Sequence, residues 1–267
     1  MYLSEYQIDL YRTSGFIVLE SLFSAEEMAV LADAYVQDCA ITGPHQVMEE
    51  GGRQIRAVYA SHARTPEFAD LVRSTRLLGA VQQLLSEKVY VYQFKINAKP
   101  PFISDGWAWH QDYAAWKAAD QLPSQQLVNA ALFLDDVTEF NGPLIFVPGS
   151  HRSGLVREGR SASARSEQHL DPDDIALRPE QVEALVRQSG MVSPKGPAGS
   201  VVFFHPELVH GSAPNMSPFQ RKLLLVTYND VSNVPLGAPR PEYIVGRDTT
   251  PLELVDGPIT RAELAAA

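Results

Sequence analysis

Short apolar segments separated by Pro, Gly and Asn dominate the second half of the chain. Residues 127–134, 144–147, 200–204 and 221–228 have the length of β-strands, and the first of them is apolar on both faces apart from Asn129. Many short strands after a helical start are typical of a β-sandwich or jelly-roll barrel. We therefore predict an α+β fold that is mainly β, with a double-stranded β-helix (cupin-like jelly roll) core and N-terminal helices packed outside.

Two signals near the N-terminus mark helix starts. Ser4-x-x-Gln7 and Ser24-x-x-Glu27 are capping boxes, in which each side chain accepts the backbone N–H of the other residue. Apolar residues at helical spacing follow each box, and the same spacing predicts another helix over residues 74–85. We interpret these helices as packing elements without a chemical role.

The strand predicted over residues 88–97 has two different faces. One face changes along its length from apolar to polar, ending in Gln93, Lys95 and Asn97. This pattern suits a half-exposed strand, and it equally suits a strand that lines a polar cavity. The other face is apolar and consists of Tyr90, Tyr92, Phe94 and Ile96.

The clearest chemical signal is the hexapeptide WAWHQD at residues 107–112. His110 and Asp112 are two residues apart, so on an extended strand their side chains point to the same face. With a second histidine they form the facial triad of non-haem Fe(II) oxygenases, which keeps open positions for substrate and oxygen. A lone His-x-Asp also occurs on ordinary surface strands. The segment that follows, residues 116–123, is predicted to be irregular.

A matching partner lies downstream. His210 precedes Ser212 by two residues, and a turn at residues 214–219 separates them from Arg221. If a hairpin centres on this turn, Ser212 and Arg221 face each other and His210 shares their face. A buried guanidinium requires an anion, which suits a dicarboxylate that chelates a metal with its near end. The remaining histidines are interpreted as ordinary polar residues: His45, His62, His151, His169 and His205.

The amino-acid composition limits the classes to which this protein can belong. With 267 residues and 45% hydrophobic residues, one domain over residues 1–267 is expected. A formal net charge of −10 argues against nucleic acid or an anionic membrane as the partner. The single cysteine, Cys39, excludes an internal disulfide and suits a reducing compartment. We predict a cytoplasmic protein with a small-molecule partner, leave its oligomeric state open, and interpret the polar residues 149–174 as a substrate lid.

Together, these motifs resemble the phytanoyl-CoA-dioxygenase-like family of Fe(II)/2-oxoglutarate oxygenases over nearly the whole sequence. The resemblance rests on His110-x-Asp112, on His210, and on Arg221 eleven residues after it. It implies that the two histidines and the aspartate hold Fe(II), and that 2-oxoglutarate and O2 are co-substrates. Within the family the protein is similar to bacterial hydroxylases of small free amino acids, especially leucine 5-hydroxylases.

The resemblance also implies roles for other residues. Arg221 and Ser212 are expected at the distal carboxylate of 2-oxoglutarate, helped by Asn97 and Lys95. The expected reaction is hydroxylation of an unactivated C–H bond in the side chain of a free aliphatic L-amino acid, with release of succinate and CO2. The substrate expected first is leucine, hydroxylated at C5. The residues expected to bind the substrate are Gln93 and Trp116, which resemble positions that contact the substrate in ectoine hydroxylases. Arg56 is a further candidate, because a guanidinium matches the carboxylate of an amino acid. Arg56 equally suits a solvated charge on a strand.

Two alternatives stay open at this point. Ectoine hydroxylases are also similar, although they usually carry Thr-Trp-His where this sequence has Ala115, Trp116 and Lys117. Ectoine or another small amino acid could therefore be the substrate. The alternative from a different class is a non-catalytic, cupin-like metal-binding protein, which the presence of Arg221 disfavours.

Overall fold

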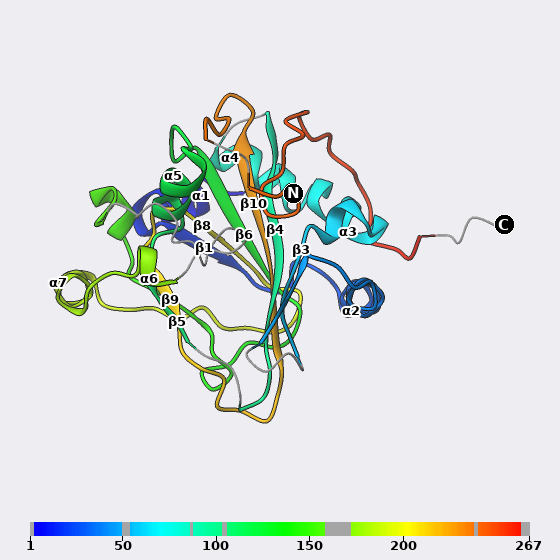
Figure 1. Ribbon diagram of the computed structural model, residues 1–267, viewed down its shortest axis with the longest axis horizontal. Helices are drawn as coiled ribbons and strands as arrows, with labels where there is room; N and C mark the ends of the chain where they lie inside the picture. The colour runs from blue at the N-terminus through cyan, green and yellow to red at the C-terminus, as the bar shows by residue number, and fades with distance from the viewer. Residues whose placement is uncertain are drawn as a thin grey trace.

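The computed structural model describes residues 3–49, 54–85, 88–102, 106–157, 172–237 and 240–262. Two antiparallel sheets form its centre, and they face each other as two layers (Figure 1). The larger sheet has the order β1 (Phe16–Leu19), β8 (Val201–Phe204), β6 (Leu127–Phe133), β10 (Arg221–Asp230), β4 (Val89–Lys99), β3 (Ile55–Tyr59) and β2 (Gln46–Met48). The smaller sheet has the order β5 (Trp107–His110), β9 (His210–Ser212) and β7 (Leu144–Phe146).

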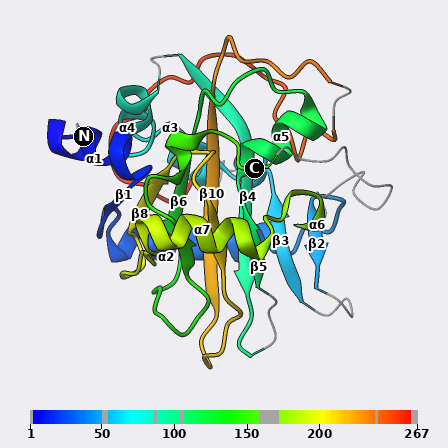
Figure 2. The ribbon, with the colours of Figure 1, turned by 90° about the vertical axis from the view of Figure 1, so that its left-hand side faces the viewer.

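Helices cover the outer face of the larger sheet and one side of the smaller one. Both predicted capping boxes are present, at Ser4 and Ser24. On the side of the smaller sheet, α7 crosses in front of the strands (Figure 2). No helix in the described ranges is long and apolar enough to cross a membrane. The helices are α1 (Glu5–Ser14), α2 (Ala25–Cys39), α3 (Pro66–Arg73), α4 (Leu78–Leu84), α5 (Asp112–Asp120), α6 (Pro172–Ile175) and α7 (Pro179–Ser189), with 3-10 turns η1 (Ser61–Ala63) and η2 (Ser150–Ser153).

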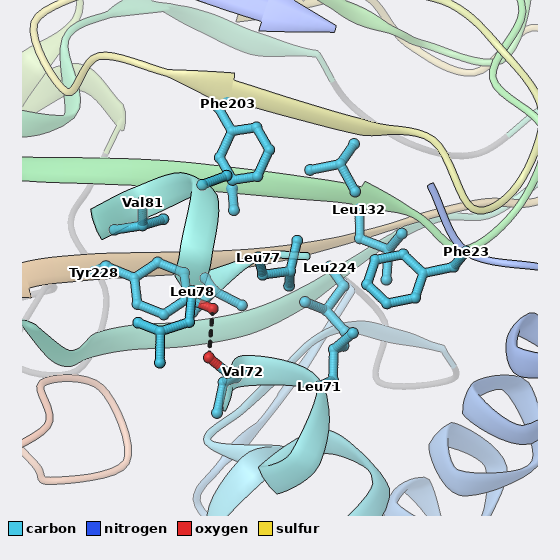
Figure 3. Packing of buried hydrophobic residues seen from close by; sticks show 14 of the residues in the cluster. Phe23, Leu71, Val72, Leu77, Leu78, Val81, Leu132, Phe203, Leu224 and Tyr228 are labelled. Carbon is cyan, nitrogen blue, oxygen red and sulfur yellow. Dashed lines mark hydrogen bonds between the residues drawn. The ribbon is translucent and has the colours of Figure 1, made fainter. Parts of the chain in front are cut away.

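The largest apolar cluster lies between the larger sheet and the N-terminal helices (Figure 3). Leu224 and Tyr228 of β10 point outward and pack with Leu71 and Leu77. The Tyr228 hydroxyl donates a hydrogen bond of 2.8 Å to the carbonyl of Val72, so its one polar atom is satisfied. Burying each such side chain contributes about 1.5–3 kcal/mol. This cluster fixes β10, and the alternate residues of β10 therefore face the smaller sheet.

One irregularity in β4 changes which side chains share a face. Thr227 of β10 pairs with Gln93, but the next residue, Tyr228, pairs with Val91. Tyr92 is therefore an extra residue, and a β-bulge of this kind interrupts the alternation of side chains.

The bulge corrects one prediction and leaves another intact. The predicted apolar face is wrong, because Tyr90 and Tyr92 pack in an inner cluster whereas Phe94 and Ile96 belong to the outer core. Beyond the bulge, Gln93, Lys95 and Asn97 all face the smaller sheet, as their spacing predicted.

Two predictions of local structure, one of a helix and one of an irregular segment, were also inaccurate. The helix predicted over residues 74–85 is shorter, because Ser74 forms a turn in which its hydroxyl accepts the backbone N–H of Leu77. The segment predicted to be irregular, residues 116–123, is largely helical, since α5 continues to Asp120.

The predicted lid, residues 149–174, lies only partly within the described residues. Its first residues form η2, and Gly149 donates a backbone hydrogen bond of 2.8 Å to Ser14 at the end of α1. Residues 158–171, which make up most of the predicted lid, lie outside the described residues. The lid therefore stays a prediction.

Candidate active site

Three potential metal ligands converge between the two sheets. His110 ends β5, His210 begins β9, and the two residues are direct cross-strand partners. Their ring centroids are 4.2 Å apart. The carboxylate of Asp112 lies 3.5 Å from Nε2 of His110 and 3.8 Å from Nε2 of His210. All three ligand atoms lie within 4.8 Å of one another, the spacing of a mononuclear metal centre.

The position of Asp112 differs from the predicted one in a single respect. It is the first residue of α5 rather than part of a strand. The prediction that it faces the same side as His110 still holds, because Gln111 between them keeps an extended backbone, with φ −122° and ψ 125°. A carboxylate in the first turn of a helix is also favoured by the helix dipole.

Gln111 holds this turn in place, and sequence reasoning missed it. Its amide nitrogen donates to the carbonyls of Gly154 and Glu207, at 2.9 and 2.7 Å. Its amide oxygen accepts the backbone N–H of Val156 at 2.8 Å. Three satisfied bonds on a buried side chain fix the turn that carries both His110 and Asp112.

Backbone carbonyls set the tautomers of both histidines. Nδ1 of His110 donates to the carbonyl of Ala108 at 2.7 Å, and Nδ1 of His210 donates to the carbonyl of Leu208 at 2.9 Å. A carbonyl can only accept, so each Nδ1 carries the proton and each Nε2 presents a lone pair. This arrangement is typical of metal-binding histidines.

The electrostatics of the ligand set favour a metal ion. Burial, reinforced by the charge of His110, lowers the pKa of His210 to about 4, so its imidazole is neutral at physiological pH. Burial opposes ionisation of Asp112, but His210, His110 and Lys95 outweigh it and hold the pKa of that carboxyl below its usual range. Two imidazoles and one carboxylate are the donor set of non-haem Fe(II) sites.

The same cavity is lined by a buried cation and a buried hydroxyl, those of Arg221 and Ser212. Arg221 is buried, yet its Nε has no hydrogen-bond partner in the described part of the protein, and neither has Oγ of the buried Ser212. Burial lowers the pKa of Arg221 to about 10, which still leaves the guanidinium charged at neutral pH. A buried cation and hydroxyl with unused donors fit the carboxylate of a bound acid.

Ser212 and Arg221 come together in a different way from the predicted hairpin. Ser212 pairs with strands of the smaller sheet, whereas Arg221 begins β10 of the larger sheet. The hairpin prediction is therefore wrong, because the backbone passes from one sheet to the other at the turn. The two side chains still line one cavity, since they face each other between the sheets.

The other predicted site residues lie at different depths. Lys95 and Asn97 line the cavity. Gln93 is buried, and its amide donates to the carbonyl of Ile244 at 3.2 Å. The register of β4 places it two residues before Lys95, on the same face.

Arg56 lies beside the cavity, whereas Trp116 lies in an apolar cluster. The guanidinium of Arg56 lies 4.7 Å from the ring centroid of Trp107, which lines the cavity. Arg56 reaches this position because β3 is irregular there: Val47 pairs with Ala57, but the next residue pairs with Ile55. Trp116 instead packs edge-on against Tyr92, with centroids 5.3 Å apart, in the inner apolar cluster.

The other described histidines lie away from the triad. His205 packs against His151, and His62 stacks on Phe94. Among the described residues, the triad is the one group of His, Cys, Asp or Glu residues placed to hold a metal. His169 lies outside the described residues.

Comparison with known proteins agrees with this geometry. The family model for phytanoyl-CoA dioxygenase (PhyH) matches residues 11–223. An L-proline trans-4-hydroxylase from Streptomyces griseoviridis is 42% identical over 224 residues, which is 80% of this chain and 81% of that protein. An ectoine dioxygenase from Bordetella bronchiseptica is 36% identical over 255 residues, 92% of this chain and 83% of the relative.

The fold also agrees with that of a solved structure. The crystal structure of EctD from S. alaskensis with 2-oxoglutarate and 5-hydroxyectoine has a TM-score of 0.85 and 31% identity, covering 97% of this chain and 89% of the other. This likeness confirms the predicted cupin-like jelly roll. From the family match and the relatives, we conclude that the protein is a dioxygenase and belongs to the phytanoyl-CoA dioxygenase family.

Proposed function

We propose that this dioxygenase hydroxylates an unactivated C–H bond in the side chain of a free aliphatic L-amino acid, with release of succinate and CO2. Fe(II) is the cofactor, and 2-oxoglutarate and O2 are the co-substrates. The observation that carries the proposal is the cavity in which His110, Asp112 and His210 lie beside the unpartnered donors of Arg221 and Ser212. The relatives named L-proline trans-4-hydroxylase and ectoine dioxygenase support an amino-acid substrate.

Each part of the cavity has its own task. His110, Asp112 and His210 hold Fe(II), which supplies the activation of O2 when it is bound. Arg221 and Ser212 bind the distal carboxylate of 2-oxoglutarate, because a guanidinium can donate two parallel bonds to a carboxylate. Lys95 and Asn97 flank the same molecule from β4, and their donors assist in orienting it.

The substrate assignment rests on the cavity wall and its rim. Leu144, Leu223 and Leu225 give the cavity an aliphatic side, suited to a hydrocarbon side chain. Arg56 makes no ion pair with a described residue, so its charge is available for the substrate carboxylate. Gln93 assists at the head group. Trp116 contributes indirectly, because it packs against Tyr92 and supports the strand that lines the cavity.

Leucine is the substrate that the sequence resemblance favours, and L-proline is the second candidate. The observation that favours proline is the 42% identity to an L-proline trans-4-hydroxylase. Both are small free amino acids with an aliphatic side chain. Packing separates such substrates by only about 1–3 kcal/mol per methylene, so the cavity contacts alone do not rank them.

The test is product analysis by mass spectrometry. The enzyme is incubated with Fe(II), ascorbate and 2-oxoglutarate and with L-leucine, L-proline, ectoine or leucine attached to a carrier protein, and succinate is measured in parallel. Hydroxyleucine as the fastest product supports the first candidate, and hydroxyproline supports the second. A faster reaction with ectoine, or turnover of carrier-bound leucine alone, would overturn the proposal that the substrate is a free aliphatic amino acid. The inactive control is Asp112→Ala.

A further inference from the structure

A buried series of polar side chains leads from the larger sheet to the metal-binding carboxylate. Thr227 of β10 and Asn129 of β6 are direct cross-strand partners, each at most 2% exposed. The Thr227 hydroxyl donates to Oδ1 of Asn129 at 2.7 Å. Nδ2 of Asn129 donates in turn to Oδ2 of Asp112 at 2.9 Å.

The direction of these hydrogen bonds follows from the chemistry of the groups. An ionised carboxylate can only accept hydrogen bonds, so the amide must present its NH2 group to Asp112. The amide oxygen then faces Thr227, and between these two oxygens only the hydroxyl can donate. Thr227 therefore holds the amide of Asn129 in the orientation that binds the carboxylate.

The location of Asn129 argues for a function beyond packing. The other six residues of β6 are apolar, and all seven are buried. An amide in such a strand costs free energy unless its hydrogen bonds are made. The Asn129 side chain makes one hydrogen bond to Asp112 of the triad and one to Thr227, so it joins the larger sheet to the active site.

We propose that Asn129, oriented by Thr227, is a positioning residue that holds the Asp112 carboxylate ready to bind the metal. Asn129 engages Oδ2, which prevents free rotation of the carboxylate and leaves Oδ1 directed toward His110. The proposal rests on the proposed metal centre. Removing a hydrogen-bond partner of a metal ligand typically weakens metal binding about 10–100-fold.

The test measures Co(II) binding to the metal-free protein by titration and by its visible absorption spectrum. Asn129→Leu is expected to raise the Kd for Co(II) about 10–100-fold and to alter the spectrum. Thr227→Val, which keeps the shape but lacks the hydroxyl, should have a smaller effect in the same direction. Thr227→Ser, which keeps the donor, should restore binding close to that of the wild type.

A matched control separates positioning from stability. Asn229 is an equally buried amide on β10, and it donates to Tyr90 and Asn233 rather than to the triad. Asn229→Leu should lower the melting temperature of the metal-free protein while leaving the Kd for Co(II) unchanged.

The outcomes distinguish the inference from the proposed function. If the wild type does not bind Co(II), or Asp112→Ala binds it equally well, the metal centre itself is wrong. If the wild type binds Co(II) and folded Asn129→Leu binds it with the same Kd and spectrum, the role of Asn129 is refuted. Should Asn129→Leu fail to fold, an unchanged Kd in Thr227→Val refutes the role of the Thr227–Asn129 pair.

Discussion

At the scale of single residues, the cavity depends on polar atoms that the protein leaves unsatisfied. Nε of Arg221 and Oγ of Ser212 are buried without a partner among the described residues, and Nη2 of Arg221 donates to the carbonyl of Gly142. Leaving such donors unpaired costs free energy, and a bound carboxylate would recover it.

Replacing Arg221 tests this account. Arg221→Ala should weaken 2-oxoglutarate binding by about 2–5 kcal/mol, because it removes a charge-assisted pair from a closed site. The measurement is the KM for 2-oxoglutarate compared with that for the amino acid. Arg221→Lys should recover only part of the loss, since Lys lacks the planar fork.

The control for this experiment is the next residue of β10. Lys222 points to the other face of the strand and pairs with Asp135 at 2.9 Å. Lys222→Ala should therefore leave the KM for 2-oxoglutarate unchanged. Equal increases in both KM values in Arg221→Ala would contradict the assigned role.

Gln111 gives a second prediction at this scale. Gln111→Ala leaves two carbonyls and one N–H in buried surroundings without their partner. We expect the free energy of unfolding to fall by about 1–3 kcal/mol, measured by urea denaturation. Gln125→Ala, at an exposed glutamine, should change it little. Equal stability of Gln111→Ala and the wild type would show that this turn does not depend on the side chain.

The sequence predicted that His110, Asp112 and His210 would come together, but it did not predict the residues that hold them in place. His110, Asp112, His210 and Arg221 stand in a recognisable spacing. Asn129 is visible in the sequence only as one polar residue in an apolar strand. Its partners, Asp112 and Thr227, lie 17 and 98 residues away. Such contacts follow from the pairing of the sheet, which local patterns do not encode.

At the scale of elements, period-two alternation was reliable where strands are regular. It failed at Tyr92, where the bulge moves two tyrosines to the inner face. It also failed for Ser212 and Arg221, because a turn between apolar runs looks the same whether the backbone forms a hairpin or changes sheets. Bulges and sheet changes are decided by tertiary packing, so a single sequence does not reveal them.

The C-terminal segment is held to α5 by a buried ion pair that no sequence pattern indicated. Arg240 donates to both carboxylate oxygens of Asp120, at 2.7 and 2.6 Å, and the Tyr92 hydroxyl donates to the same carboxylate. Nearby, Gly246 donates a backbone hydrogen bond of 2.8 Å to Tyr92. These contacts join the tail, α5 and the bulge of β4 into one packed unit.

This ion pair leads to a prediction about stability. Arg240→Ala leaves the Asp120 carboxylate buried without its cation, so the free energy of unfolding should fall by about 3–5 kcal/mol in urea denaturation. Arg240→Met with Asp120→Asn should recover part of this loss, since no buried charge remains. Arg247→Ala, at an exposed neighbour, is the control. A loss no larger than that of the control would show that the pair contributes little.

At the scale of the whole molecule, one buried histidine, His210, and two half-buried ones, His62 and His205, link stability to pH. Burial lowers the pKa of His62, His205 and His210 from 6.5 to about 4. Electrostatic repulsion adds to this effect, from Arg64 on His62, from His151 on His205, and from His110 on His210. In the unfolded state each imidazole would bind a proton near its ordinary pKa of about 6.5.

The sign of the pH dependence follows from this difference. Between pH 6.5 and about 4 the unfolded state binds more protons than the folded one, so the free energy of unfolding must fall as the pH falls. Each histidine contributes at most about 3 kcal/mol over this window. Above pH 6.5 these groups contribute no pH dependence. Glu27, whose pKa the neighbouring Arg76 holds at about 2 against the effect of burial, acts in a lower window, below about pH 4.5.

We therefore expect the metal-free protein to lose stability steadily from pH 6.5 to 4.5 in urea denaturation. His62→Gln removes one of the three groups at a site remote from the triad, and it should make the slope of stability against pH shallower. The double variant His62→Gln with His205→Gln should flatten it further. A wild-type stability that stays constant over this range would contradict the linkage, and so would a slope that is the same in His62→Gln as in the wild type. Omitting the metal is essential, because protonation of His210 also competes with metal binding.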